Sequence, residues 1–126
     1  MKITTFNPLI ITKNVDEVVR VFEELGFEKR HAPSGTSGAG NEYTDYRMTD
    51  ANGFHVDVAY IDAPVPQDIT AIRVNVDNFD EGYRFLTEHG FKSPSGKPVT
   101  ETDHSKGVLM TSPSGFGIVL CQHIKK

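Results

Sequence analysis

The sequence predicts an α+β fold made of two successive βαβββ modules. Residues 14–27 and 78–91 match at a constant offset of 64, with seven identities in fourteen positions and no gap. A second match, at an offset of 62, relates residues 48–58 to residues 110–120. Two matches at nearly the same offset indicate a tandem duplication.

Both modules are expected to lie within one domain. The chain has 126 residues, which is close to the size of one average domain. We therefore expect a single domain over residues 1–126, with a first module at about residues 1–61 and a second module at about residues 69–124.

Each module begins with a strand followed by a helix. Residues 9–12 and 72–76 are rich in β-branched side chains, as strands prefer. Apolar residues then recur at helical spacing between residues 15 and 25 and, more sparsely, between residues 79 and 86. These apolar stripes predict that each helix packs on the sheet as part of the core.

The ends of both helices carry recognisable signals. Asn14 and Asn78 are candidate N-cap residues, and each is followed three positions later by a glutamate, close to a capping box. Gly26 and Gly90 stand where a residue in the left-handed conformation would end each helix.

The remainder of each module predicts a short strand and then a hairpin. Residues 27–31 and 91–93 are expected to form the short strands, and residues 33–40 are rich in Gly and Ser, which predicts a loop. The segments 50–53 and 112–115 contain Asn-Gly and Pro-Ser-Gly, which favour the turns of hairpins. Each module is therefore expected to close with a hairpin.

Composition excludes several classes of function. With 13 Lys and Arg against 17 Asp and Glu, the chain has a formal charge of −4, which argues against a nucleic-acid partner. A single cysteine, Cys121, excludes an internal disulfide framework and a zinc finger, and favours a reducing, cytoplasmic compartment. No apolar run is long enough for a membrane span, so no membrane association is expected.

Three local patterns resemble a known family. They are the strand followed by Asn-Val-Asp-Glu, the Leu-Gly-Phe helix end, and the closing hairpin Ser-Pro-Ser-Gly-Phe-x-Ile-x-Leu. With the duplication, they resemble the vicinal oxygen chelate superfamily, which includes glyoxalase I, bleomycin-resistance proteins and extradiol dioxygenases. The resemblance covers nearly the whole chain. It implies a curled eight-stranded mixed sheet around a cleft, with the helices outside, and a homodimer.

The same resemblance implies four metal-ligand positions. They fall here on Asn7, Asp57, Ala71 and Val119, and only Asp57 is an ordinary ligand for a hard metal ion. Because a catalytic divalent metal normally needs three or more protein ligands, we expect no metal and no other cofactor. His55 lies two residues from Asp57 on the same predicted strand, but a His-x-Asp pair alone is weak evidence for a metal site.

Strand alternation predicts which side chains line the cleft, because residues two apart on a strand share a face. The opposite face is then almost wholly apolar and is expected to lie beneath the helices. In the second hairpin, Val108 and Met110 are predicted to share the face of Val119. The predicted ligand-binding residues are Asn7, Tyr46, Met48, His55, Asp57, Arg73 and Asn75.

Two interpretations of Asp57 stay open. Asp57 and His55 would form an acid–base pair, since a carboxylate tunes a neighbouring imidazole near neutral pH. Alternatively, Asp57 and Arg73 would form an ion pair between the two modules, since a buried unpaired charge is costly. Cys121 is interpreted as a small core residue rather than a nucleophile.

The favoured hypothesis is a metal-free small-molecule binding protein of the bleomycin-resistance type, which holds an aromatic or cationic compound near Asp57 and Tyr46. One alternative is an enzyme, either a glyoxalase-type lyase or isomerase, with a metal or an acid–base pair, or a dioxygenase-like enzyme. Another is an interaction module whose dimer surface carries the function. The identity of the ligand stays open.

Overall fold

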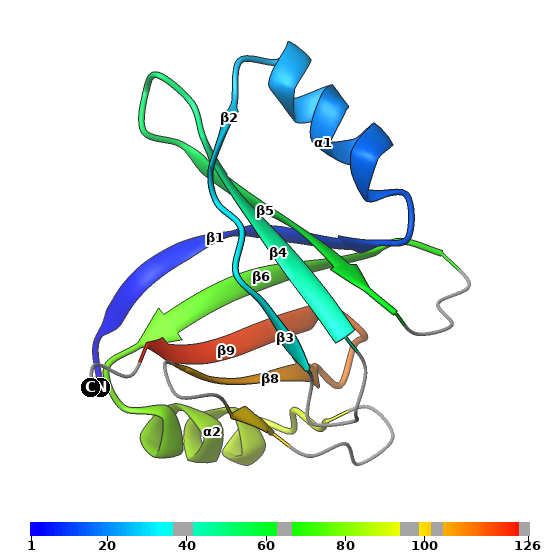
Figure 1. Cartoon of the computed structure of the whole chain (residues 1–126). Helices are drawn as coiled ribbons and strands as arrows, with labels where there is room; N and C mark the ends of the chain where they lie inside the picture. Colours follow the sequence, from blue (N-terminus) through cyan, green and yellow to red (C-terminus); the bar gives the residue numbers. More distant parts are fainter. Residues whose placement is uncertain (37–41, 63–66, 94–98, 102–104, 124–126) are drawn as a thin grey trace.

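The computed structural model describes residues 1–36, 42–62, 67–93, 99–101 and 105–123, and these form nine strands and two helices (Figure 1). The first module contains β1 (Ile3–Thr12), α1 (Val15–Glu24), β2 (Glu28–His31), β3 (Ser34–Thr36), β4 (Glu42–Thr49) and β5 (His55–Ile61). The second module contains β6 (Ile69–Val76), α2 (Phe79–Glu88), β7 (Thr100–Glu101), β8 (Ser105–Thr111) and β9 (Gly117–His123).

The strands form one mixed sheet in the order β2-β4-β5-β1-β6-β9-β8-β7, and β3 pairs with β4 beside this path. In each module the first and last strands are parallel, β1 with β5 and β6 with β9. The modules join where β1 and β6 pair in antiparallel register, with Asn7 opposite Arg73. The predicted curled mixed sheet of eight strands is confirmed, with β3 as an additional short strand.

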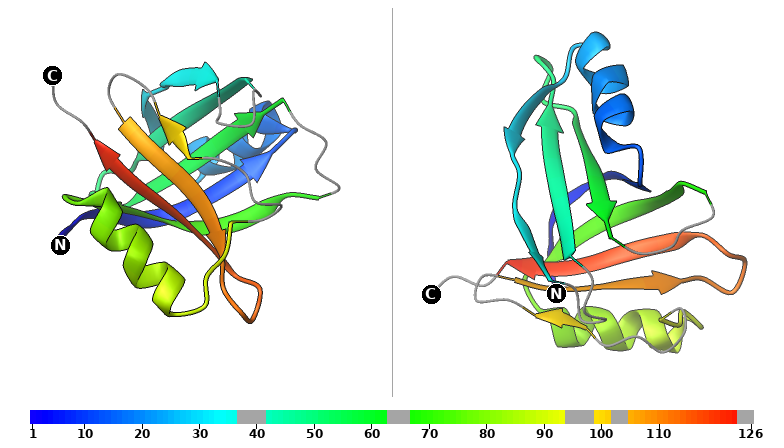
Figure 2. Two further views of the ribbon diagram at one scale, coloured as in Figure 1. Left: turned by 90° about the horizontal axis from the view of Figure 1, so that it is seen from below. Right: turned by 45° about the vertical axis from the view of Figure 1, so that its right-hand side comes forward.

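The sheet is sharply curved between the modules, so that β4 and β5 stand at an angle to β8 and β9 (Figure 2). The two helices lie at opposite ends of the molecule, α1 against β5 and α2 against β9. None of the helices among the described residues has the length and apolarity required to cross a membrane.

Each helix covers a separate apolar core. Beneath α1 the buried residues are Val19, Met48, Val56 and Val58. Beneath α2 they are Val76, Phe79, Leu86, Val108, Met110 and Leu120. The face of the sheet that carries these side chains is the apolar face expected from strand alternation, and the opposite face is free to form a cleft.

The predicted helix ends are confirmed. Gly26 has φ of +108° and Gly90 has φ of +85°, a conformation that other residues adopt only with strain. The residue after each glycine donates its N–H to a carbonyl five residues earlier, Phe27 to Phe22 at 2.9 Å and Phe91 to Leu86 at 3.0 Å. This is the bond pattern of a Schellman motif, and it aims each chain away from its helix into the next segment.

The predicted N-caps differ between the modules. The Asn78 side chain accepts a hydrogen bond from the Glu81 N–H at 3.1 Å, as expected for an N-cap. Asn14 also stands at the N-cap position, directly before α1, but its side chain makes no cap hydrogen bond. There, the Asn14 N–H donates to the Thr12 hydroxyl at 2.9 Å, and the buried threonine organises the entry to the helix.

Two connecting segments also differ from expectation. Ser34–Thr36, predicted as part of a loop, forms β3 and pairs with β4, while residues 37–40 of that loop lie outside the described residues. Residues 91–93, predicted as a strand, make only an isolated bridge between Lys92 and Thr111. The edge of the second module is formed by β7 instead, through its pairing with β8.

Candidate functional site

The concave face of the sheet holds a cleft with a cavity volume of about 220 Å³, lined by residues of both modules. One described chain is therefore enough to form it. The apolar part of its lining comes mainly from β1, β5, β8 and β9 and includes Leu9, Ile11, Ala59, Ile61, Leu109 and Val119. The charged and polar part includes Tyr43, Asp45, Arg47, Arg73, Asn75 and Cys121.

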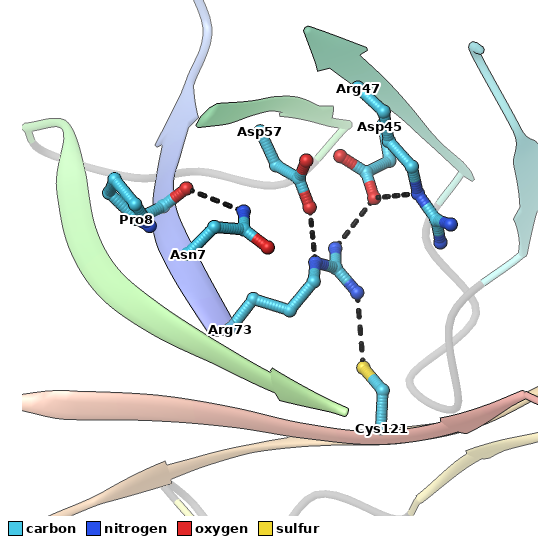
Figure 3. Close-up of polar contacts among 7 residues, drawn as sticks. All are labelled: Asn7, Pro8, Asp45, Arg47, Asp57, Arg73 and Cys121. Atoms are coloured by element: carbon cyan, nitrogen blue, oxygen red, sulfur yellow. Dashed lines mark hydrogen bonds and ion pairs between the residues drawn. The ribbon is translucent and has the colours of Figure 1, made fainter. Parts of the chain in front are cut away.

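An arginine from the second module forms the centre of the cleft floor (Figure 3). The Arg73 side chain reaches from β6 to two carboxylates on β5 and β4. Its Nε forms an ion pair with Asp57, and its Nη2 donates to Asp45 Oδ2 at 2.6 Å. Only 8% of Arg73 is exposed, and 4% of each aspartate. The Asp57–Arg73 ion pair that the sequence left open is therefore present, and a second carboxylate joins it.

Two further side chains complete this group. Arg47 Nε lies 3.5 Å from Asp45 Oδ2, and the Arg47 side chain is 41% exposed, so it is the outermost of the charged residues. Arg73 Nη1 donates to Cys121 Sγ at 3.1 Å (Figure 3). We call Asp45, Arg47, Asp57, Arg73 and Cys121 the floor cluster. Its formal charge is zero when the thiol is protonated, since two guanidinium groups face two carboxylates.

Burial shifts the protonation of two members of the floor cluster. It raises the pKa of Asp45, an effect that the negative charge of Asp57 adds to and that Arg73 and Arg47 oppose. Asp45 Oδ1 is buried and accepts no hydrogen bond from the described residues. Burial likewise raises the pKa of the Cys121 thiol despite the nearby Arg73, so the sulfur is a neutral thiol at pH 7. Cys121 was predicted to be a small core residue, but it lines the cleft and belongs to neither apolar core.

Searches with the sequence find no matching protein-family model and no matching curated protein. Solved structures do match. A glyoxalase/bleomycin resistance protein/dioxygenase superfamily member from Vibrio splendidus has a TM-score of 0.60 at 16% identity, over 96% of this chain and 99% of that one. Methylmalonyl-CoA epimerase from Mycobacterium tuberculosis has a TM-score of 0.67 at 13% identity, over 98% and 90%. The chain has the vicinal oxygen chelate fold.

A third similar structure is a mutant of 4-hydroxymandelate synthase from Streptomyces coelicolor, with a TM-score of 0.57 at 8% identity, over 99% of this chain and 49% of that one. Proteins with the vicinal oxygen chelate fold thus include an epimerase and a synthase. At these identities the likeness concerns the fold, and the chemistry of the site has to be argued from the residues of this chain.

The residues present do not fit the divalent metal that this fold implies. Of the four positions, Ala71 and Val119 have no ligand atom, and Asp57 is already paired with Arg73. The fourth, Asn7, is buried and donates its side-chain N–H to the Pro8 carbonyl at 3.0 Å. Within the part of the chain that is described, no three His, Cys, Asp or Glu side chains are grouped as a metal site requires.

The vicinal oxygen chelate sheet brings some predicted site residues together and separates others. Asp57 and Arg73 meet in the floor cluster, and Asn75 lines the cleft beside them. His55 does not contribute to the cleft lining. It is exposed at the first position of β5, where its Nδ1 is hydrogen-bonded to the Thr49 hydroxyl at 3.0 Å. The predicted acid–base pair of His55 and Asp57 is therefore wrong.

The predicted cleft positions of Tyr46 and Met48 are also wrong. Tyr46 pairs with Val58 and Met48 with Val56, so both side chains belong to the core beneath α1. The second hairpin repeats this error. Met110 is a core residue beneath α2, Val108 belongs to that core but also borders the cleft, and it is Leu109 that pairs with Val119.

Sequence reasoning consequently missed Asp45 and Arg47, which face the cleft from β4. The strands pair Thr49 with His55, so the hairpin loop has five residues, and odd-numbered residues of β4 lie opposite odd-numbered residues of β5. A usable signal was present in the strand itself. The charged Asp45 and Arg47 alternate with the less polar Tyr46 and Met48, as expected when Tyr46 and Met48 face the core.

Proposed function

We propose that the protein binds a compact aromatic compound in its cleft and does so without a metal. The observation that carries this proposal is the combination of apolar walls with a floor on which Asp45, Arg47 and Arg73 are paired with one another, while the buried Asp57 pairs with Arg73 from behind the cleft surface. Small-molecule sites are typically apolar cavities with a few polar groups that fix orientation. A floor of mutually neutralised charges supplies such groups without demanding a charged ligand.

Charge pairing favours a neutral ligand over a cationic one. A cation beside Asp57 would compete with Arg73, which is already held by two carboxylates. Tyr46, expected to provide an aromatic wall for a cation, packs instead beneath α1. The polar groups best placed for a neutral ring are Tyr43 and the half-exposed guanidinium of Arg47, since guanidinium groups stack on aromatic faces.

The cavity limits the size of the ligand. Its volume of about 220 Å³ is below the range of about 300–1,000 Å³ that is usual for drug-sized ligands. A compound with one or two rings fits this space better than a large cofactor.

A thermal-shift screen tests the proposal with three matched sets of compounds, namely neutral, cationic and anionic derivatives of the same one- and two-ring scaffolds. The proposal predicts that neutral members raise Tm by several degrees, because a ligand that binds only the folded state stabilises it. If only the cationic compounds raise Tm, the ligand is a cation and the proposed preference for a neutral ligand is wrong. No stabilisation by any set would contradict the proposal.

Two alanine-to-phenylalanine variants locate the binding. Ala59→Phe places a ring in the cleft, and Ala51→Phe makes the same change in the exposed turn after β4. Binding in the cleft predicts that the thermal shift disappears in Ala59→Phe and persists in Ala51→Phe. If the compound still raises the Tm of both variants, it binds outside the cleft.

One observation favours a second candidate function, acid–base catalysis. Burial raises the pKa of Asp45, and its Oδ1 accepts no hydrogen bond from the described residues, which makes Asp45 the candidate proton-transfer group of the cleft. One of the similar structures is a methylmalonyl-CoA epimerase, and this supplies a substrate with which the candidate can be tested. Incubation with methylmalonyl-CoA in D₂O tests this candidate. Deuterium incorporation that is lost in Asp45→Asn would support it, and its absence in the wild type would exclude this substrate.

The homodimer implied by the resemblance is a separate proposal. Light scattering after size exclusion measures it directly, as a molar mass of twice the 14.0 kDa of one chain. A mass equal to that of one chain would contradict it.

A further inference from the structure

The least expected feature of the cleft is an arginine buried at the centre of the sheet. Burying a guanidinium group is costly unless charges and hydrogen bonds compensate it. Here Asp57 and Asp45 supply two negative charges, and Cys121 accepts a third contact. All three charged side chains are at least nine-tenths buried. An assembly of this kind needs a reason beyond the packing of the sheet.

The position of Arg73 in the strand register suggests that reason. On β6, Arg73 is paired with Asn7 of β1 on one side and with Val119 of β9 on the other. The next pairs along β1 place Leu9 opposite both Asp57 and Ala71. The four positions that correspond to metal ligands in this fold therefore surround Arg73 in the sheet, and the guanidinium is paired with the one carboxylate among them.

We propose that the guanidinium of Arg73 is a built-in cation that takes the place of the metal ion in this cleft. It neutralises Asp57 as a metal ion would. It also pairs with Asp45, which is not at one of the four metal-ligand positions. The proposal concerns the protein without any ligand and does not depend on the proposed aromatic compound. If the proposal holds, the oxygen atoms of a cation site are present, and the Arg73 guanidinium occupies the place of the cation.

Removal of the guanidinium should therefore uncover a divalent cation site. Asp45 and Asp57 would be left as two buried carboxylates without a central positive charge, and the Asn7 amide oxygen lies on the neighbouring strand. Carboxylate and amide oxygens are ligands that suit hard divalent ions such as Mn²⁺. Asp45 Oδ1, which accepts no hydrogen bond from the described residues, offers a further free oxygen.

The test compares Mn²⁺ binding by the wild type, Arg73→Met and Arg47→Met. Both substitutions remove a guanidinium that contacts Asp45 and keep an unbranched chain of similar length, but only one removes the buried charge. Loss of the signal of free Mn²⁺ in electron paramagnetic resonance measures binding, and Tm measures its effect on stability. We expect one Mn²⁺ per chain in Arg73→Met, at least about tenfold tighter than in the wild type or Arg47→Met, with a rise in Tm of several degrees.

Two further variants show whether the two carboxylates hold the ion. Arg73→Met combined with Asp57→Asn should bind Mn²⁺ much more weakly than Arg73→Met alone, because one of the two carboxylates is replaced by a neutral amide. Arg73→Lys keeps a positive charge at the same position and should exclude Mn²⁺ as the wild type does.

Several results would overturn the proposal. Equal Mn²⁺ affinity in the wild type and Arg73→Met would show that the guanidinium does not block the site. Absence of binding in a folded Arg73→Met chain would show that the carboxylates do not form one. If Arg73→Met is unfolded without metal, refolding from urea with Mn²⁺ present decides the matter, and failure to refold would also contradict the proposal.

Discussion

The two modules share one framework but differ on the side that faces the cleft. Met48 of the first module and Met110 of the second occupy equivalent positions, and both are almost completely buried, 0% and 1% exposed. On the cleft side the equivalent residues differ in kind. Relating the hairpins by the offset of 62, the pairs are Asp45 with Gly107, Arg47 with Leu109, and Asp57 with Val119.

The difference shows how a repeated unit can form an asymmetric site. Every charged position of the first hairpin has an uncharged counterpart in the second, while on the first strands Leu9 corresponds to Arg73 at the offset of 64. The second module thus supplies one cation to the two carboxylates of the first. Core positions are restrained by packing beneath the helices, whereas cleft positions are free to diverge.

The largest expected effect comes from removing the cation that links the modules. Arg73→Met should lower the free energy of unfolding by about 3–5 kcal/mol, because it leaves two buried carboxylates without their partner. Arg47→Met should lower it by less than about 1 kcal/mol, since Arg47 is partly exposed and its ion pair is looser. Urea denaturation in the absence of divalent metal measures both values. Equal losses of stability in the two variants would contradict the different roles assigned to the buried Arg73 and the partly exposed Arg47.

A second, smaller difference lies at the helix ends. Gly26→Ala should cost about 1–2 kcal/mol, because alanine is strained at positive φ, and no atom lies within 4 Å of the added methyl group. Gly90→Ala carries the same strain, and its methyl group would lie 2.8 Å from Pro113 Cγ, so it should cost about 1 kcal/mol more. Paired thermal and urea unfolding curves provide the comparison. A larger loss in Gly26→Ala than in Gly90→Ala would be inconsistent with the structure.

The smallest expected effect distinguishes the two helix starts. Asn78→Ala should lower stability by about 1 kcal/mol, because its side chain accepts the Glu81 N–H. Asn14→Ala should change the free energy of unfolding by only about 0.3 kcal/mol or less, since Asn14 makes no side-chain cap bond. Unfolding free energies of the two variants at pH 7 test this, and a result in which both lose the same stability would show that both caps form.

Sequence patterns predicted the framework well because local chemistry determines it. The repeated glycine after each helix, the apolar stripe of each helix and the alternation on β5 and β9 are all readable within a few residues. The repeat itself then related the two modules. Asn14 shows the limit of such reading, because both asparagines stand at the N-cap position but only Asn78 makes the side-chain cap hydrogen bond.

The cleft was predicted less completely because it depends on pairing between distant strands. A five-residue loop, in which Asp50 accepts hydrogen bonds from the Asn52 and Phe54 N–H groups, determines the register of the first hairpin. A shift of one residue exchanges the two faces of a strand, which is why Tyr46 was assigned to the cleft and Asp45 was not. Arg73 was predicted to face Asp57, but its second carboxylate could not be found without the correct register.

The central claim is that Arg73 and Asp57 form an ion pair between the two modules, and a double-mutant cycle measures that pair directly. Unfolding free energies are needed for the wild type, Arg73→Met, Asp57→Asn and the double variant, in the absence of divalent metal. If the two side chains are paired, the double variant should be more stable than the sum of the two single effects implies, by about 1–3 kcal/mol. Additive effects, within about 0.5 kcal/mol, would contradict the pairing.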